Sequence, residues 1–316
     1  MSGRLPIAAG QDGGFWQQIF DFDNYGELLA LVQNSLLAGA LLGLVGGLVG
    51  VFVIMRDLPF AVHGISELSF AGGAAALLAG VNIVAGSIVG SLVAAAVIGI
   101  LGVRARDRNS VIGIIMPFGL GLGVLFLSLY KGRAANKFGI LTGQIVAVDT
   151  PQLAWLVGTS AVALIALAVV WRPLTFSSAD PEVAEARGVP VRALSLSFML
   201  VLGLAVALCV QIVGALLVLA LLVTPAAAAA RITASPVLLP VLSVVFALAS
   251  MEGGTLLALG STVPISPYVT TLSFLIYLGC RLVGSRRAAK ATRVPFLAGP
   301  RTTARVSEPS SPGSTR

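Results

Sequence analysis

Nine long apolar stretches run through this chain, and they constrain the fold more than any other feature. Each has about 20 residues, the length of helix that crosses the hydrocarbon core of a bilayer. Only the slender break at Gln211–Gly214 separates the sixth stretch from the seventh. The pattern therefore predicts an all-α, polytopic transmembrane helix bundle of eight to nine spans, with stretches at residues 31–55, 61–80, 83–103, 111–130, 153–171, 193–211, 213–231, 236–258 and 267–283.

Composition supports a membrane protein and leaves little room for a separate extramembrane domain. Of the 316 residues, 57% are hydrophobic and only 10% are charged, whereas soluble domains carry about a quarter charged residues. We expect an extracytoplasmic segment at residues 1–26, a transmembrane domain at 27–283 and a disordered basic cytoplasmic tail at 284–316. The first 26 residues lack a basic region and an apolar core, so a cleavable signal peptide is not expected.

The positive charges are distributed unevenly along the chain. If the connections at Arg56, Arg104–Arg108, Arg172–Arg192 and Arg231 and the segment after Arg281 are cytoplasmic, they hold 16 of the 20 basic residues. This bias is the one that the positive-inside rule predicts, and it favours nine passes with the N-terminus outside. The excess of cations is thus explained by topology rather than by a nucleic-acid surface. The basic tail is expected to be solvated, and contact with anionic lipid is the alternative.

The sequence lacks the common motifs for metal-binding sites and for phosphate-binding loops. Cys209 and Cys280 lie inside apolar runs without a CxxC pair, and His63 is the only histidine. Multi-histidine metal sites are therefore excluded. No G-x-x-x-x-G-K-[ST] sequence occurs, so this chain cannot itself supply the phosphate-binding loop of an ATPase.

The segment after Arg56 holds the most informative pair of polar residues. Pro59 suits the first turn of a helix, and His63 and Glu67 then lie one turn apart on the same helix face. Ionisable side chains inside a span usually face a cavity or pathway. Imidazole and carboxylate are ligands for zinc or manganese. An internal His–Glu hydrogen bond is the alternative reading.

The stretch Val213–Arg231 carries a proline in mid-span. Pro225 lacks a backbone donor, so the helix is expected to break or kink there, with Thr224 easing the break. Such a break either lines a pathway or is absorbed by packing. Glu252, near the outer end of the eighth stretch, is expected at the membrane interface rather than in a pore.

Residues 180–190 have the signature of a short surface helix. Asp180 is a good N-cap, Pro181 fits the first position, Glu182 opens the helix, Gly188 suits its C-terminal side and Pro190 stops it. A short helix on the cytoplasmic side is a natural docking element for another protein, although it could also serve as a mere connector.

Small residues recur at helix-packing spacing. In lipid such stripes let helix backbones approach closely. We therefore expect a compact bundle, with close contacts at Gly39, Gly43 and Gly47, at Gly46 and Gly50, and at Gly86 and Gly90.

Together these segments resemble the integral-membrane permeases of ABC importers for zinc and manganese. Phe52–Asp57 and His63–Glu67 fall in register with the motifs around the end of that family's first span. Gly214–Arg231 is nearly identical to a second family motif, and Ala184–Val189 matches the family's cytoplasmic helix. The resemblance covers residues 30–283. The chain departs from the family pattern in having His63 where the family has Asp, and Glu67 where it has His.

The resemblance implies a transport subunit rather than an enzyme, in the bacterial cytoplasmic membrane. It implies a cytoplasmic ATP-binding subunit, an extracytoplasmic metal-binding protein and a permease homodimer as partners. Zn²⁺ or Mn²⁺ would be cargo, with no permanent cofactor. By the same resemblance His63 and Glu67 would touch the metal in transit, and the ATPase would grip the short helix through Glu182, Ala184, Glu185, Arg187 and Gly188.

Two other classes of protein compete with this interpretation. A proton-coupled secondary transporter could use His63 and Glu67 as a relay, but such folds often have paired broken helices, and only Val213–Arg231 is clearly broken. An intramembrane enzyme would need a nucleophile–base pair or a ligand set, and no matching motif is present.

Overall fold

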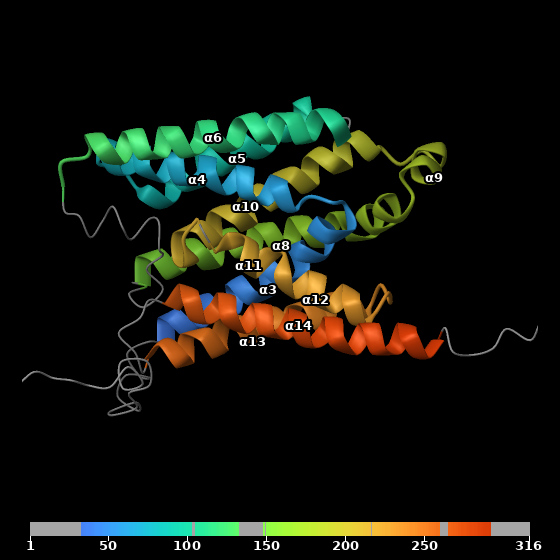
Figure 1. Cartoon of the computed structure of the whole chain (residues 1–316). Helices are drawn as coiled ribbons and strands as arrows, with labels where there is room; N and C mark the ends of the chain where they lie inside the picture. Colours follow the sequence, from blue (N-terminus) through green and yellow to red (C-terminus); the bar gives the residue numbers. More distant parts are fainter. Residues whose placement is uncertain are drawn as a thin grey trace, which may run out of the picture.

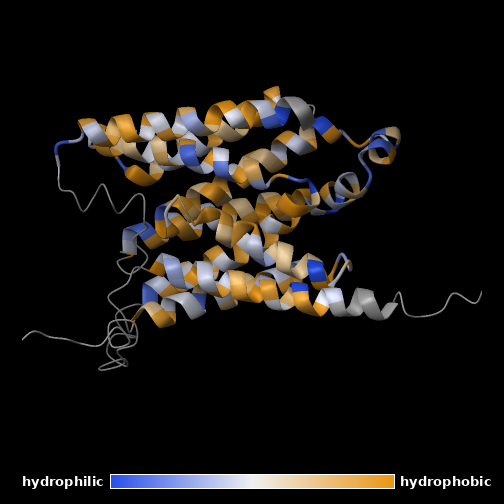
Figure 2. Ribbon diagram, in the orientation of Figure 1, coloured by the Kyte–Doolittle hydropathy of each residue, from blue (hydrophilic) through white to orange (hydrophobic). Residues whose placement is uncertain are grey.

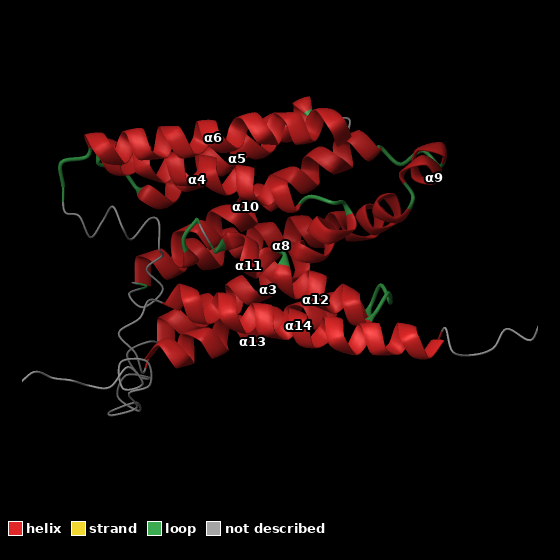
Figure 3. Ribbon diagram, in the orientation of Figure 1, coloured by secondary structure: helices red, strands yellow, loops and turns green. Residues whose placement is uncertain are grey.

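The computed structural model describes residues 33–102, 105–132, 148, 150–215, 217–259 and 265–291. Every regular element in these ranges is a helix, and the helices run roughly along one common direction (Figures 1 and 3). The expectations for residues 1–26 fall outside these ranges. In chain order the helices are α3 (Gln33–Met55), α4 (Pro59–Ala79), α5 (Ile83–Leu101), α6 (Ala105–Leu129), α8 (Thr150–Ala179), α9 (Pro181–Ala186), α10 (Val191–Val213), α11 (Val218–Leu222), α12 (Thr224–Ile232), α13 (Leu238–Leu259) and α14 (Ile265–Ala291).

Eight of the described helices are long and apolar enough to cross a membrane. The seventh predicted stretch, 213–231, does not form one continuous span. Gly214 takes a positive φ of 87° and ends α10, and a second break at Val223 separates α11 from α12. These two short helices still carry the chain back toward the end of the bundle from which α10 came (Figure 1).

Two helices extend beyond the C-terminal ends that the sequence predicts. The stretch 153–171 is part of α8, which continues through Arg172 and Pro173 to Ala179. The tail was predicted to begin at residue 284, but α14 continues to Ala291, and residues 292–316 lie outside the described ranges. Both errors have the same cause, because hydropathy marks where a helix is apolar and not where its backbone hydrogen bonding stops.

Burial separates a central group of helices from a peripheral one. Buried residues make up 67% of the apolar window of α3 and 72% of those of α4 and α10, against 28% in α5 and α6, 22% in α8 and 17% in α14. The peripheral helices turn large apolar side chains outward, as Figure 2 shows in orange along the bundle. Such a surface suits lipid contact rather than water.

The small-residue stripes lie at close helix contacts, as the sequence predicts. A Cβ added at Gly47 would lie 2.6 Å from Cα of Val244 on α13, and Gly86 faces the backbone of Gly72 on α4. Hydroxyl groups join helices at similar approaches. Ser243 Oγ of α13 donates to the carbonyl oxygen of Gly47 at 2.7 Å. Packing and interhelical hydrogen bonds of this kind hold helices together where no hydrophobic force does.

The basic connections collect at one end of the bundle. Arg56, Arg108 and Arg192 border one pocket together with Gly102 and Pro181, so three connections meet there. Figure 1 shows α9, the loop after α12 and the end of α14 at the same end. The arrangement agrees with the topology that the charge bias predicts.

Candidate metal pathway and coupling site

The His63–Glu67 pair lies in the first turns of α4. Pro59 occupies the first turn of this helix, as predicted, and Gly80 closes its other end in the left-handed conformation. The structure brings the two side chains together, with His63 Nε2 3.6 Å from Glu67 Oε1. The hydroxyl of Ser66 donates to the backbone carbonyl oxygen of His63 at 2.8 Å.

The two partners differ in their exposure. The Glu67 side chain is 6% exposed, whereas that of His63 is 27% exposed. Glu67 Oε2 is buried and has no hydrogen-bond partner among the described residues. A buried carboxylate oxygen without a partner is costly, so it is a ready acceptor for a cation or a proton.

Tight packing around α4 supports the pair. Gly64 lies beside Ile112 of α6 and Ile98 of α5, and Gly119 of α6 lies against the backbone of Glu67 and Leu68. Across the described part of the chain, no three His, Cys, Asp or Glu side chains gather as a metal cage would require. The pair therefore offers two protein ligands and leaves the remaining coordination positions of an ion to other donors.

The predicted break site at Thr224 and Pro225 lies at the junction of α11 and α12. Pro225 falls in the first turn of α12, where its missing N–H costs no helical hydrogen bond. The carbonyl oxygen of Leu222 points at Gly50 of α3 so closely that a Cβ there would overlap it. Because α11 also packs against α4, the broken segment is adjacent to the helix that carries His63 and Glu67.

The short helix α9 has the caps that its sequence predicts. Asp180 accepts a hydrogen bond from the backbone N–H of Val183 at 3.0 Å, and Gly188 has a positive φ of 82°. Ala184 is fully buried, whereas Glu182, Glu185 and Arg187 are exposed. The helix projects beyond the end of the bundle (Figure 1), so its outer face is available to a partner.

Arg56 links the α3–α4 connection to the end of α8 by hydrogen bonds. The sequence did not predict its partners. Arg56 donates from Nε to Ser178 Oγ at 2.9 Å and from Nη2 to Ser177 Oγ at 3.1 Å. Its guanidinium also lies 5.8 Å from the ring centre of Phe198. Burial first, and then the positive charge of Arg108, lower the pKa of Arg56. No local signal pairs residues that are 121 positions apart.

Glu252 of α13 is a second carboxylate within a span. Its Oε1 is buried and has no hydrogen-bond partner within the ranges that the structure describes. This oxygen contacts the position where Gly39 of α3 would carry a Cβ. The carboxylate therefore packs against α3, and it lies on a different helix from the His63–Glu67 pair.

The fold is that of a multi-span helical membrane protein, and the family match and relatives given next make it a permease of the bacterial cytoplasmic membrane. Over residues 29–284 the sequence matches the ABC 3 transport family, and the chain belongs to this family.

Named relatives and a solved structure support the same assignment. The chain is 30% identical over 203 residues to the manganese transport system membrane protein MntC of Halalkalibacterium halodurans, covering 64% of this chain and 70% of that protein. It is 32% identical over 199 residues to the manganese import system permease protein ScaB of Streptococcus parasanguinis, covering 63% and 71%. Among solved structures it resembles PsaBC from Streptococcus pneumoniae in complex with Fab, with a TM-score of 0.76, 27% identity and coverage of 85% of this chain and 98% of that one.

Proposed function

We propose that this chain is the permease subunit of an ATP-driven importer that moves manganese or zinc into the cell. The observation that carries the proposal is the buried Glu67 carboxylate, which has one oxygen beside His63 and the other without a partner. Both ions accept imidazole and carboxylate ligands. The names of the relatives favour manganese.

His63 and Glu67 act in this proposal as transient ligands. A pathway site must bind an ion well enough to admit it and weakly enough to release it. Two protein ligands meet this requirement better than a complete cage, since water can fill the remaining positions and leave again. The metal is therefore cargo, and the proposal includes no resident cofactor.

In this proposal, partner proteins bind the permease, drive its conformational change and deliver the metal. A cytoplasmic ATP-binding subunit docks on the exposed face of α9, formed by Glu182, Glu185, Arg187 and Gly188 around the buried Ala184. The break at Thr224 and Pro225 lets the segment beside α4 adjust when the bundle moves. An extracytoplasmic protein delivers the metal, and a second permease chain completes a two-fold pathway.

Uptake of radioactive Mn²⁺ and Zn²⁺ by vesicles that contain the permease and its ATPase tests the ligand pair. Glu67→Gln and His63→Gln should each reduce uptake at least several-fold while leaving insertion and ATPase association intact. Glu252→Gln is the matched control, because it neutralises another carboxylate with a buried oxygen that lacks a partner among the described residues. Normal uptake in a Glu67→Gln/His63→Gln double variant would refute the assignment. Uptake abolished by a protonophore but independent of ATP would favour the proton-coupled alternative.

Co-purification with the ATP-binding subunit tests the docking role of α9. Glu185→Arg reverses an exposed charge on this helix without touching the Asp180 cap. We expect weaker co-purification and lower metal-stimulated ATP hydrolysis. Arg281→Glu, an exposed charge reversal on α14, serves as the control. Equal behaviour of the two variants would remove α9 from the interface.

A further inference from the structure

A cavity of about 420 Å³ lies at the basic end of the bundle, beside the connection that precedes α4. Its walls come from the α3–α4 connection, the ends of α5 and α8, and the starts of α6, α9 and α10. This volume is in the usual range for small-ligand sites, roughly 300–1,000 Å³. Apolar side chains of Met55, Leu58, Ile98 and Met199 line part of the cavity, and polar groups line the rest.

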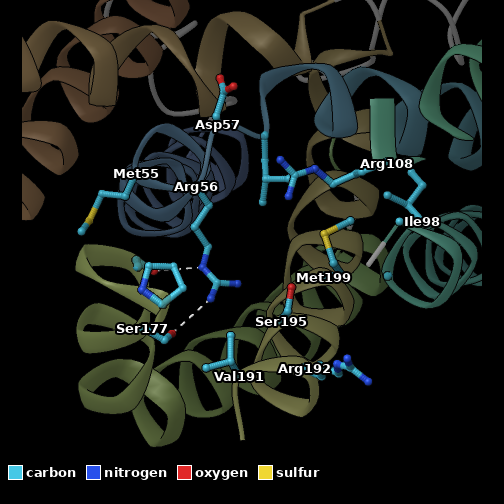
Figure 4. A pocket seen from close by; sticks show the side chains of 15 residues that line it. Met55, Arg56, Asp57, Ile98, Arg108, Ser177, Val191, Arg192, Ser195 and Met199 are labelled. Carbon is cyan, nitrogen blue, oxygen red and sulfur yellow. Dashed lines mark hydrogen bonds between the residues drawn. The ribbon is translucent and has the colours of Figure 1, made fainter. Parts of the chain in front are cut away.

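The polar lining is strongly cationic. Among the described side chains that border the cavity, three are arginines, Arg56, Arg108 and Arg192, and one is acidic, Asp57. In Figure 4 the guanidinium group of Arg56 extends toward Ser177, and that of Arg108 reaches into the same space from another wall. The two groups are close enough for the positive charge of Arg108 to lower the pKa of Arg56. The carboxylate of Asp57 points away from them, and Arg192 turns its guanidinium to the side.

Arg56 and Arg108 differ in their hydrogen-bond partners. Arg56 bonds Ser177 and Ser178, as described above. Arg108 Nε is buried, and its N–H has no hydrogen-bond acceptor among the residues that the structure describes. Like charges that border one partly buried space repel, and a buried donor without an acceptor costs free energy. An anion between the two guanidinium groups would remove both penalties.

We propose that this cavity binds a phosphate group between Arg56 and Arg108. Guanidinium groups present forked donors that match the oxygens of a phosphate. The hydroxyl of Ser195 points into the same space from α10 (Figure 4) and adds a further donor. The phosphate belongs either to an anionic lipid headgroup of the cytoplasmic leaflet, which basic pockets between membrane helices recognise, or to a small soluble phosphate compound.

Thermal unfolding of the full-length permease in a nonionic maltoside detergent tests the site. The midpoint is followed by tryptophan fluorescence while inorganic phosphate or dioctanoyl phosphatidylglycerol is added, with chloride at equal ionic strength and dioctanoyl glycerol as controls. A ligand that binds only the folded chain raises the midpoint in a saturable way. Arg108→Gln should weaken the apparent affinity by about tenfold or more, the effect of losing one charged hydrogen-bond donor.

Arg108→Gln breaks no hydrogen bond seen within the described residues, so we expect it to fold. Arg108→Lys, which keeps the charge but loses the fork, gives a second, milder variant. Arg281→Gln, an exposed arginine of α14 outside the cavity, should bind as the parent chain does.

Each outcome decides between the sources or overturns the proposal. Stabilisation by both additives identifies phosphate itself as the recognised group. Stabilisation by phosphatidylglycerol alone identifies a lipid headgroup, and stabilisation by inorganic phosphate alone identifies a soluble ligand. The proposal is overturned if neither additive acts, if chloride or dioctanoyl glycerol acts equally, or if Arg281→Gln loses as much affinity as Arg108→Gln.

Discussion

Gly50→Ala and Gly46→Ala form a matched test of the contact between α3 and the broken segment. Both glycines lie on one stripe of α3 and face α11. At Gly46 an added Cβ would meet Cγ of Leu221 at 3.4 Å, which is ordinary van der Waals contact. At Gly50 it would overlap the carbonyl oxygen of Leu222. A backbone oxygen cannot rotate aside as a side chain can, so α11 or α3 must shift.

The expected magnitudes follow from these two contacts. Replacing a helical glycine by alanine stabilises a helix by roughly 0.5–1 kcal/mol, and this gain applies to both variants. Overpacking at Gly50 costs about 1–3 kcal/mol. Gly46→Ala should therefore be neutral or slightly stabilising, and Gly50→Ala should be less stable than Gly46→Ala by about 1–3 kcal/mol.

Heating in detergent followed by size-exclusion chromatography measures the midpoint at which the folded permease is lost. One kcal/mol shifts the midpoint by about 2–4 °C in domains somewhat smaller than this one. Gly50→Ala should thus melt several degrees below Gly46→Ala. Identical midpoints would show that α11 does not lie against α3 as described.

Two further substitutions test single hydrogen bonds. Asp180→Ala removes the N-cap of α9, worth about 1 kcal/mol, and should speed amide exchange at Val183 while Asp180→Asn keeps it slow; equal exchange in both variants would contradict the cap. Ser243→Ala removes the bond to Gly47 and should cost about 0.6 kcal/mol. Ser197→Ala is its control, since that exposed hydroxyl bonds only within its own helix, and equal losses in both would argue against an interhelical role.

Local chemistry explains which parts of the fold could be predicted. The ends of α9 follow from Asp180, Pro181 and Gly188, because caps depend on residues within a few positions of the helix end. The spans follow from apolar runs of bilayer length. The broken return of the chain after Gly214 was harder to predict, since an apolar composition does not distinguish one span from two short helices.

The candidate site was predictable only in part. His63 and Glu67 stand out because ionisable residues are scarce in the spans, and their separation by four residues places them together on a helix. The bonds from Arg56 to Ser177 and Ser178 join segments that are distant in sequence. Neither serine has a feature that sets it apart from the many other serines of the chain, so their role required the three-dimensional arrangement.

The length of α8 determines how α9 stands relative to the membrane. A helix of 30 residues is about 45 Å long, whereas the hydrocarbon core is roughly 30 Å thick. If Thr150 marks the outer edge, the core ends near Trp171 and Arg172, residue types that favour the interface. The last turns of α8, which begin near Pro173, then extend about 10 Å beyond the hydrocarbon core and hold α9 clear of the lipid. A force that a partner applies to α9 would be transmitted through the end of α8 to the α3–α4 connection, because Arg56 of that connection bonds Ser177 and Ser178.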